Sequence, residues 1–148
     1  MTQTEVHYQQ DFYAWIYHNI ELLRQRKFSE INIDTLIEEL ESMAKGDRRE
    51  LRSHFIILIA HLLKWQFEPE HRSRSWRSSI LEQRYQILEQ LADSPSLKPR
   101  LSEAITQAYP GAVKIAMKET ELPRSTFPKD CPYRLEELLD EDFYPDTH

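Results

Sequence analysis

The chain has 148 residues, of which 40% are hydrophobic and 30% charged, and a formal net charge of -6. This length suits one domain with one core, and we predict a single domain over residues 1–148. Two glycines and one cysteine exclude a glycine-rich nucleotide loop, an intrachain disulfide and a cysteine metal site. Neither a membrane-spanning run nor a signal peptide is visible, so we expect a cytoplasmic protein. No cofactor fingerprint and no set of metal ligands is visible either, so we expect no cofactor and no metal.

The first predicted helix runs from about Asp11 to Gln25, after a segment, residues 1–10, that we expect to be flexible. Asp11 suits the N-cap, where its carboxylate would accept a backbone hydrogen bond. Apolar side chains recur at helical spacing and form one face. They are Phe12, Trp15, Ile16, Ile20 and Leu23.

The strongest helical pattern extends from Asp34 to Gln66. Its apolar positions fall within about 120° of arc, so they form one stripe. They are Leu36, Ile37, Leu40, Met43, Ala44, Leu51, Phe55, Leu58, Leu62 and Trp65. Gly46 and a capping-box pattern from Asp47 to Glu50 could start a second helix. Because the stripe keeps its phase through Gly46, we favour one helix.

This long helix also predicts the centre of the core. Leu58, Leu62 and Trp65 lie on the stripe where the helix is apolar nearly all round. We expect them to be buried beside the face of the first helix that carries Phe12 and Trp15.

The second half of the chain is broken by prolines, because all eight lie at or after Pro69. We predict helices over about Ser75–Asp93, Leu97–Thr120 and, briefly, Pro132–Leu139. Residues 121–148 should wrap back over the helices as an irregular acidic tail, since residues 119–148 hold nine acidic and three basic side chains. The fold class is therefore all-α, a bundle of four to six helices around one long central helix.

Several short motifs occur in a recognisable order between about residues 10 and 145. They are Ile37–Glu41, His61–Trp65, Ser75-Trp76, Gln83-Arg84, Ser94–Leu97, Phe127-Pro128, Cys131–Tyr133 and Leu138–Asp140. Their order and spacing resemble the bacterial domain-of-unknown-function 29 family. The resemblance implies a small all-helical fold and no particular activity.

Glu38 and Glu41 lie on one helix face and could serve as acid and base, with His61 and Arg84 completing a hydrolase site. The alternative is a solvated helix face, or ion pairs with basic side chains. Arg84 falls close to the apolar stripe of its own helix, where a lone guanidinium is costly, so it should reach a carboxylate or backbone carbonyls. We predict that it pairs with a glutamate of the Glu38–Glu41 turn.

A basic cluster surrounds the start of the helix that begins near Ser75. Arg72, Arg74 and Arg77 supply guanidiniums, and Ser75 adds a hydroxyl, so this helix start could bind phosphate groups or a nucleic-acid backbone. The alternative is that the cluster matches the protein's own acidic tail. The acidic net charge disfavours nucleic acid.

The histidines and the cysteine offer no obvious chemistry. His54 and His61 are about 10 Å apart along a helix, too far to share a metal, so we interpret them as core histidines with satisfied ring nitrogens. Cys131 could lie at a helix start with a lowered pKa, or be a small buried side chain.

We interpret the chain as a non-catalytic macromolecular interaction module with an unknown protein partner. The alternatives are anion binding through Arg72, Arg74 and Arg77, and a hydrolase using Glu38, Glu41, His61 and Arg84. Tyr13, Tyr17 and Tyr85 lie off the predicted stripes, which favours a weak or moderate homodimer wherever the C-terminal tail leaves them uncovered.

Overall fold

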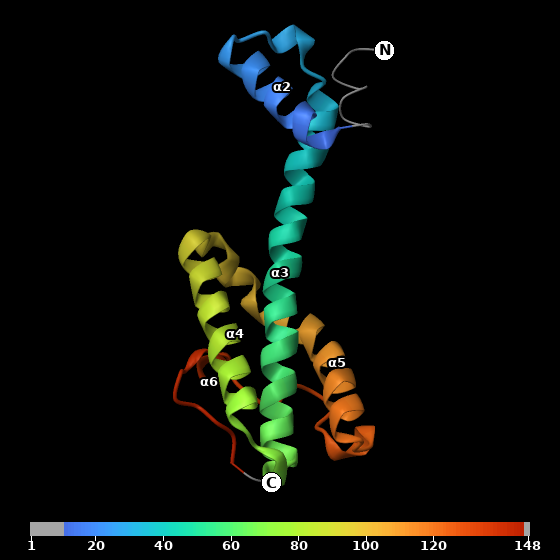
Figure 1. The fold of residues 1–148 in the computed structure, drawn as a ribbon, viewed down its shortest axis with the longest axis vertical. Coiled ribbons are helices and arrows are strands. Elements are labelled where there is room, and N and C mark those ends of the chain that lie inside the picture. The colour runs from blue at the N-terminus through green and yellow to red at the C-terminus, as the bar shows by residue number, and fades with distance from the viewer. Residues whose placement is uncertain (1–10, 147–148) are drawn as a thin grey trace. The chain divides into compact units, whose positions relative to one another are not determined.

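The computed structural model describes residues 11–146, so the predicted flexible segment 1–10 lies outside the described residues. The helices are α2 (Phe12–Arg24), α3 (Ile33–Phe67), α4 (Arg74–Asp93), α5 (Leu101–Thr120) and α6 (Leu135–Leu139). Short 3-10 turns join them, and residues 11–146 contain no strand (Figure 1). The all-α prediction is confirmed. None of these helices is long and apolar enough to cross a membrane.

The chain divides into two compact units, Met1–Gly46 and Asp47–His148. The single domain expected from the sequence stays a prediction. Helix α3 runs without interruption from Ile33 to Phe67, so the prediction of one continuous helix through Gly46 is confirmed.

The first unit contains α2 and the beginning of α3. Asp11 caps α2, because its carboxylate accepts a hydrogen bond from the backbone N–H of Ala14 at 3.0 Å. Trp15, Leu22 and Ile31 are buried there. The N-cap predicted from the sequence is therefore confirmed.

The core of the second unit is formed by the later part of α3 with α4, α5 and the C-terminal segment (Figure 1). Leu58, Leu62 and Trp65 are buried in it, as predicted. Phe12 and Trp15 belong to the first unit, so their expected place beside these residues stays a prediction.

The alanines on α5 are one reason why the helices of this core pack closely. Ala104, Ala108, Ala112 and Ala116 recur every four residues and are all buried. Gly111 faces α3, since a methyl group added to it would lie 3.4 Å from the side chain of Ile56. Helix α5 begins at Leu101 and not at Leu97, because Pro95–Arg100 forms a 3-10 turn that contains a second proline, Pro99.

The C-terminal segment closes the same core. Phe127, Tyr133 and Leu138 are buried, and the ring of Tyr144 lies 4.8 Å from that of Trp65. Helix α6 begins three residues after the predicted Pro132, because Arg134 is its N-cap and donates its backbone N–H to the carboxylate of Glu137 at 2.9 Å.

Candidate functional site

Arg84 is the most buried charged side chain of the described residues, at 1% exposure. Its guanidinium donates three hydrogen bonds to backbone carbonyls at the end of α6. Nε donates to Leu138 at 2.8 Å, Nη2 to Glu137 at 3.1 Å and Nη1 to Glu141 at 3.4 Å.

The predicted pairing of Arg84 with a glutamate of the Glu38–Glu41 turn is therefore wrong. The last carbonyls of a helix have no intrahelical donor, and the fork of a guanidinium can satisfy several of them at once. Burial lowers the pKa of Arg84, while Tyr144 and the neighbouring carboxylates Asp140, Asp142 and Glu141 oppose that change.

The residues of the hydrolase hypothesis have separate environments. Glu38 and Glu41 are exposed in the first unit, where they line a shallow hollow of about 240 Å³ with Ser42 and Lys45. His61 belongs to the second unit, and its Nδ1 donates to the carbonyl of Ile57 at 2.9 Å. Burial lowers its pKa below the ordinary value of 6.5. Because a general acid needs a carboxylate shielded from water, exposed Glu38 and Glu41 give this hypothesis no support.

Two of the three arginines of the predicted anion site already contact other residues of the chain. Arg72 donates from Nε to the carbonyl of Trp65 at 2.8 Å and lies over its ring, 4.9 Å from the centroid. Arg77 lies 5.6 Å from the same ring and 5.9 Å from that of Tyr144. Two of the three guanidiniums thus stack on aromatic rings, an interaction that favours burial of Trp65.

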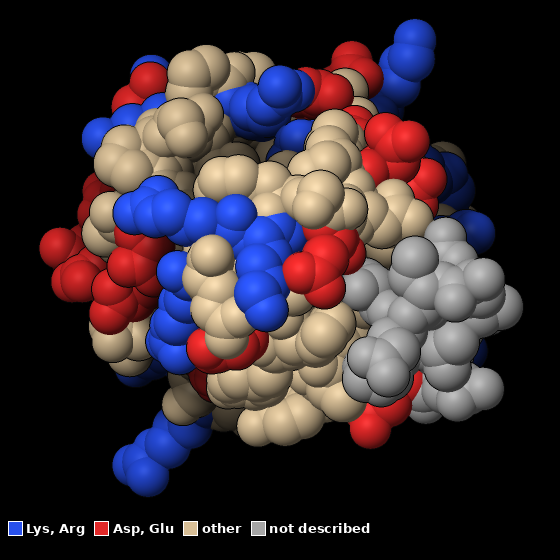
Figure 2. All heavy atoms as spheres, turned by 90° about the horizontal axis from the view of Figure 1, so that it is seen from above, with Lys and Arg blue, Asp and Glu red and all other residues tan. Residues whose placement is uncertain are grey.

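Arg74 and Ser75 are exposed in the first turn of α4. The N-cap is Ser73, whose hydroxyl accepts from the N–H of Trp76 at 3.2 Å. Figure 2 shows that basic and acidic side chains are intermingled on the face it draws, without a broad region of one sign. The formal net charge of -6 also disfavours a nucleic-acid partner.

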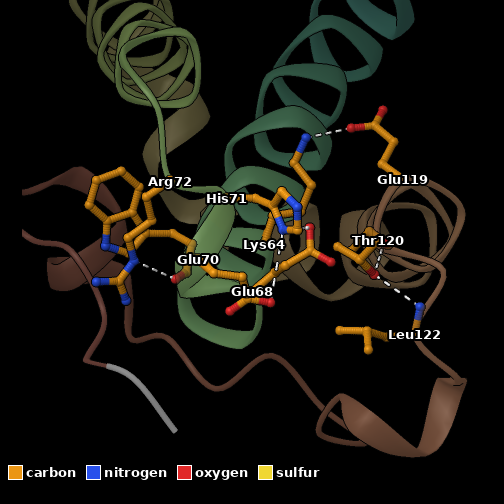
Figure 3. A network of polar contacts seen from close by, with 10 residues as sticks. Lys64, Glu68, Glu70, His71, Arg72, Glu119, Thr120 and Leu122 are labelled. Carbon is orange, nitrogen blue, oxygen red and sulfur yellow. Dashed lines mark hydrogen bonds and ion pairs between the residues drawn. The ribbon is translucent and has the colours of Figure 1, made fainter.

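Lys64 is a buried cation that the sequence analysis did not single out. Its ammonium pairs with the carboxylate of Glu119 on α5 and lies 4.9 Å from the centre of the Trp76 ring (Figure 3). Its position could have been noticed in the sequence, because Lys64 lies where the long helix is apolar nearly all round. The contact joins α3 to α5 and gives the buried ammonium a partner, without which its charge would be strongly destabilising.

Glu68, Glu70 and His71 form a small titratable cluster in the turn after α3 (Figure 3). Their carboxylate oxygens and a ring nitrogen lie within 4.8 Å of one another. Glu70 and His71 are exposed, and the His71 nitrogen is already 3.2 Å from Glu68. The contact between His71 and Glu68 within the turn therefore accounts for the cluster.

The remaining predicted candidates are structural. His54 donates from Nδ1 to the side-chain oxygen of Gln83 at 2.7 Å. The half-buried thiol of Cys131 donates to the carbonyl of Tyr133 at 3.7 Å, and burial raises its pKa. The alternative in which Cys131 has a lowered pKa at a helix start is therefore wrong.

Within residues 11–146, two of the helical faces formed by exposed apolar side chains had been assigned to the core or left unassigned in the sequence analysis. One is the first part of α3, where Ile33, Ile37, Leu40 and Met43 are between 47% and 66% exposed. The other is on α4, where Leu81, Tyr85 and Leu88 are between 41% and 58% exposed. Such contiguous faces are typical of association surfaces.

The α4 face borders a hollow of about 410 Å³. It is lined by Ser78, Leu81, Glu82, Arg84, Tyr85, Leu88 and Glu141. The C-terminal segment thus contributes Glu141 but leaves Tyr85 exposed.

The family model for the Domain of unknown function DUF29 matches residues 7–144, nearly the whole chain. The resemblance drawn from the sequence motifs is therefore confirmed. No curated protein and no solved structure matches the chain.

Proposed function

This chain belongs to the DUF29 family, and we propose that it is a non-catalytic macromolecular interaction module. The observation that carries the proposal is the exposed apolar face at the beginning of α3. Ile33, Ile37, Leu40 and Met43 follow one another at helical spacing, and each has between about half and two thirds of its surface in water. A helix gains most of its stability by burying such a face, so a partner on this face would stabilise the unit.

The partner that fits this face best is a second copy of the chain. Glu41 precedes Lys45 by one helical turn on the flank of the face, and both are exposed. Two copies of α3 packed antiparallel about Met43 would bring each Glu41 close to Lys45 of the other copy. The exposed rings of Tyr13 and Tyr17, 5.0 Å apart on α2, add amphipathic surface to the same unit.

Sedimentation velocity across a concentration series tests this proposal. The wild-type chain should shift from 17.8 kDa toward twice that mass as the concentration rises. Leu40→Glu should abolish the shift, because it places a carboxylate in the middle of the apolar face. Ser53→Glu, which adds the same charge at an exposed position elsewhere on α3, should leave it unchanged.

A mass that stays at 17.8 kDa at every concentration would refute the homodimer. So would a Leu40→Glu variant that associates like the wild type. The cytoplasmic location expected from the sequence remains a prediction.

A further inference from the structure

The exposed face of α4 is a groove with an apolar floor. We call it the α4 groove and define it by its lining residues, Ser78, Leu81, Glu82, Tyr85, Leu88 and Glu141, with Arg84 beneath. Leu81, Tyr85 and Leu88 are four and three residues apart, so they follow one line along the helix. A hollow of about 410 Å³ over such a line has room for side chains of another helix.

The charge that the α4 groove presents to solvent is negative. Glu82 is exposed on one flank of the apolar line, and Glu141 is exposed on the other, on the segment after α6. Glu89 stands on the same side as Glu82 and accepts a hydrogen bond from the hydroxyl of Tyr85 at 2.8 Å. Both flanks of the floor are therefore acidic.

Arg84 does not cancel this pattern at the surface. Its guanidinium is buried under the groove and donates to three backbone carbonyls. The exposed cation nearest along the same helix line is Arg77, one turn before Leu81, and its guanidinium lies against the rings of Trp65 and Tyr144.

From this combination we infer that the α4 groove binds a basic amphipathic helix of a partner protein. Apolar side chains of the partner at positions i, i+4 and i+7 would pack on Leu81, Tyr85 and Leu88. Lysine or arginine on both flanks of that partner helix would lie beside Glu82 and Glu141. A nucleic-acid backbone is repelled by the same carboxylates.

This inference does not depend on the proposed homodimer. The dimer face belongs to the first unit, and every residue of the α4 groove belongs to the second. Loss of one interaction leaves the residues of the other unchanged, so the two proposals can fail separately.

The test measures the binding of a labelled synthetic helix to the full chain by fluorescence anisotropy. The probe has about 18 residues, with leucine at the i, i+4 and i+7 spacing and lysine on both flanks of the leucine line. A matched probe carries glutamate in place of each lysine. We expect the lysine probe to bind at least about tenfold more tightly than the glutamate probe at low salt, and the difference to shrink as salt is added.

Variants assign the binding to the groove. Leu81→Lys should lower the affinity for the lysine probe at least about tenfold, since the substitution removes contacts with the groove floor and adds a like charge. The double variant Glu82→Lys with Glu141→Lys should reverse the preference between the two probes. Glu103→Lys, an equal charge change at an exposed position of α5, should change nothing. Circular dichroism confirms that each variant is folded.

Three results would overturn the inference. One is a wild-type chain that binds neither probe, or both equally. Another is a Leu81→Lys variant that keeps its affinity, because the probe then binds elsewhere. The third is a wild-type dimer that Leu81→Lys dissociates, because a second copy then occupies the groove.

Discussion

Arg84 links one helix to a segment that lies far along the chain. Its guanidinium satisfies the carbonyls of Glu137, Leu138 and Glu141, and it also lies 5.7 Å from the Tyr144 ring. A single side chain therefore holds the last turn of α6 against α4. This role needs the charge and the fork of an arginine, which no shorter or neutral side chain supplies.

Replacing Arg84 should destabilise the chain. Arg84→Ala removes three hydrogen bonds to backbone carbonyls and opens a cavity, and we expect a loss of about 3–5 kcal/mol in the free energy of unfolding. Arg84→Met should cost less, because its chain keeps part of the packing of the arginine stem. Urea denaturation followed by circular dichroism measures both, and equal losses in the two variants would show that packing contributes nothing.

The partners of Arg84 show what the sequence could and could not provide at this scale. The helical wheel placed the side chain near the apolar stripe of α4, so its burial and its need for acceptors were predictable. The choice of acceptors was not, because backbone carbonyls are present at every position and only the fold decides which remain unpaired. The glutamates of the Glu38–Glu41 turn were therefore a misleading guide.

At the scale of elements, the positions of the helices were predicted better than the packing of the helices against one another. Hydrophobic periodicity gave α2, α3 and α4 to within two residues at each end. Errors gathered near prolines, where a 3-10 turn replaced the expected start of α5 and an extended stretch replaced that of α6. Periodicity also identified the apolar stripe of α3 but not where it is exposed, because that depends on which helices cover it.

Gly46 is the weakest residue for helix formation within α3. It lies inside the helix, and a methyl group added there would meet nothing within 4 Å. Gly46→Ala should therefore stabilise the helix by about 0.5–1 kcal/mol, because alanine loses less conformational entropy on folding.

Thermal and urea denaturation followed by circular dichroism measure this gain. Ser53→Gly, at an exposed position of the same helix, is the reverse control and should lower stability. A loss of stability in Gly46→Ala would show that the glycine is needed for a bend of α3.

At the scale of the whole molecule, the main core and the first unit are formed by different stretches of the sequence. Every member of the main core lies between Leu51 and Leu138. A chain comprising residues 47–148 keeps all of them, and its new helix end would carry the Asp47 to Glu50 capping pattern noted in the sequence. We expect this fragment to fold by itself.

A cooperative urea transition, followed by tryptophan fluorescence from Trp65 and Trp76, would report its folding. The shorter fragment 47–126 is the control, since it lacks Phe127, Tyr133 and Leu138 and should unfold without a cooperative transition. A fragment 47–148 without a transition would mean that the core needs the first unit.

The closing of the core by the C-terminal segment has a consequence for synthesis. Tyr133 donates its hydroxyl to Gln66, which the ribosome has added 67 residues earlier, and Glu141 follows Arg84 by 57 residues. During that interval the nascent helices leave the ribosome with an apolar side still in water, where chaperones or neighbouring nascent chains can bind it. A stop codon between Thr126 and Tyr133 would release a polypeptide that has every long helix of this fold but lacks the residues that close its core, Tyr133 and Leu138.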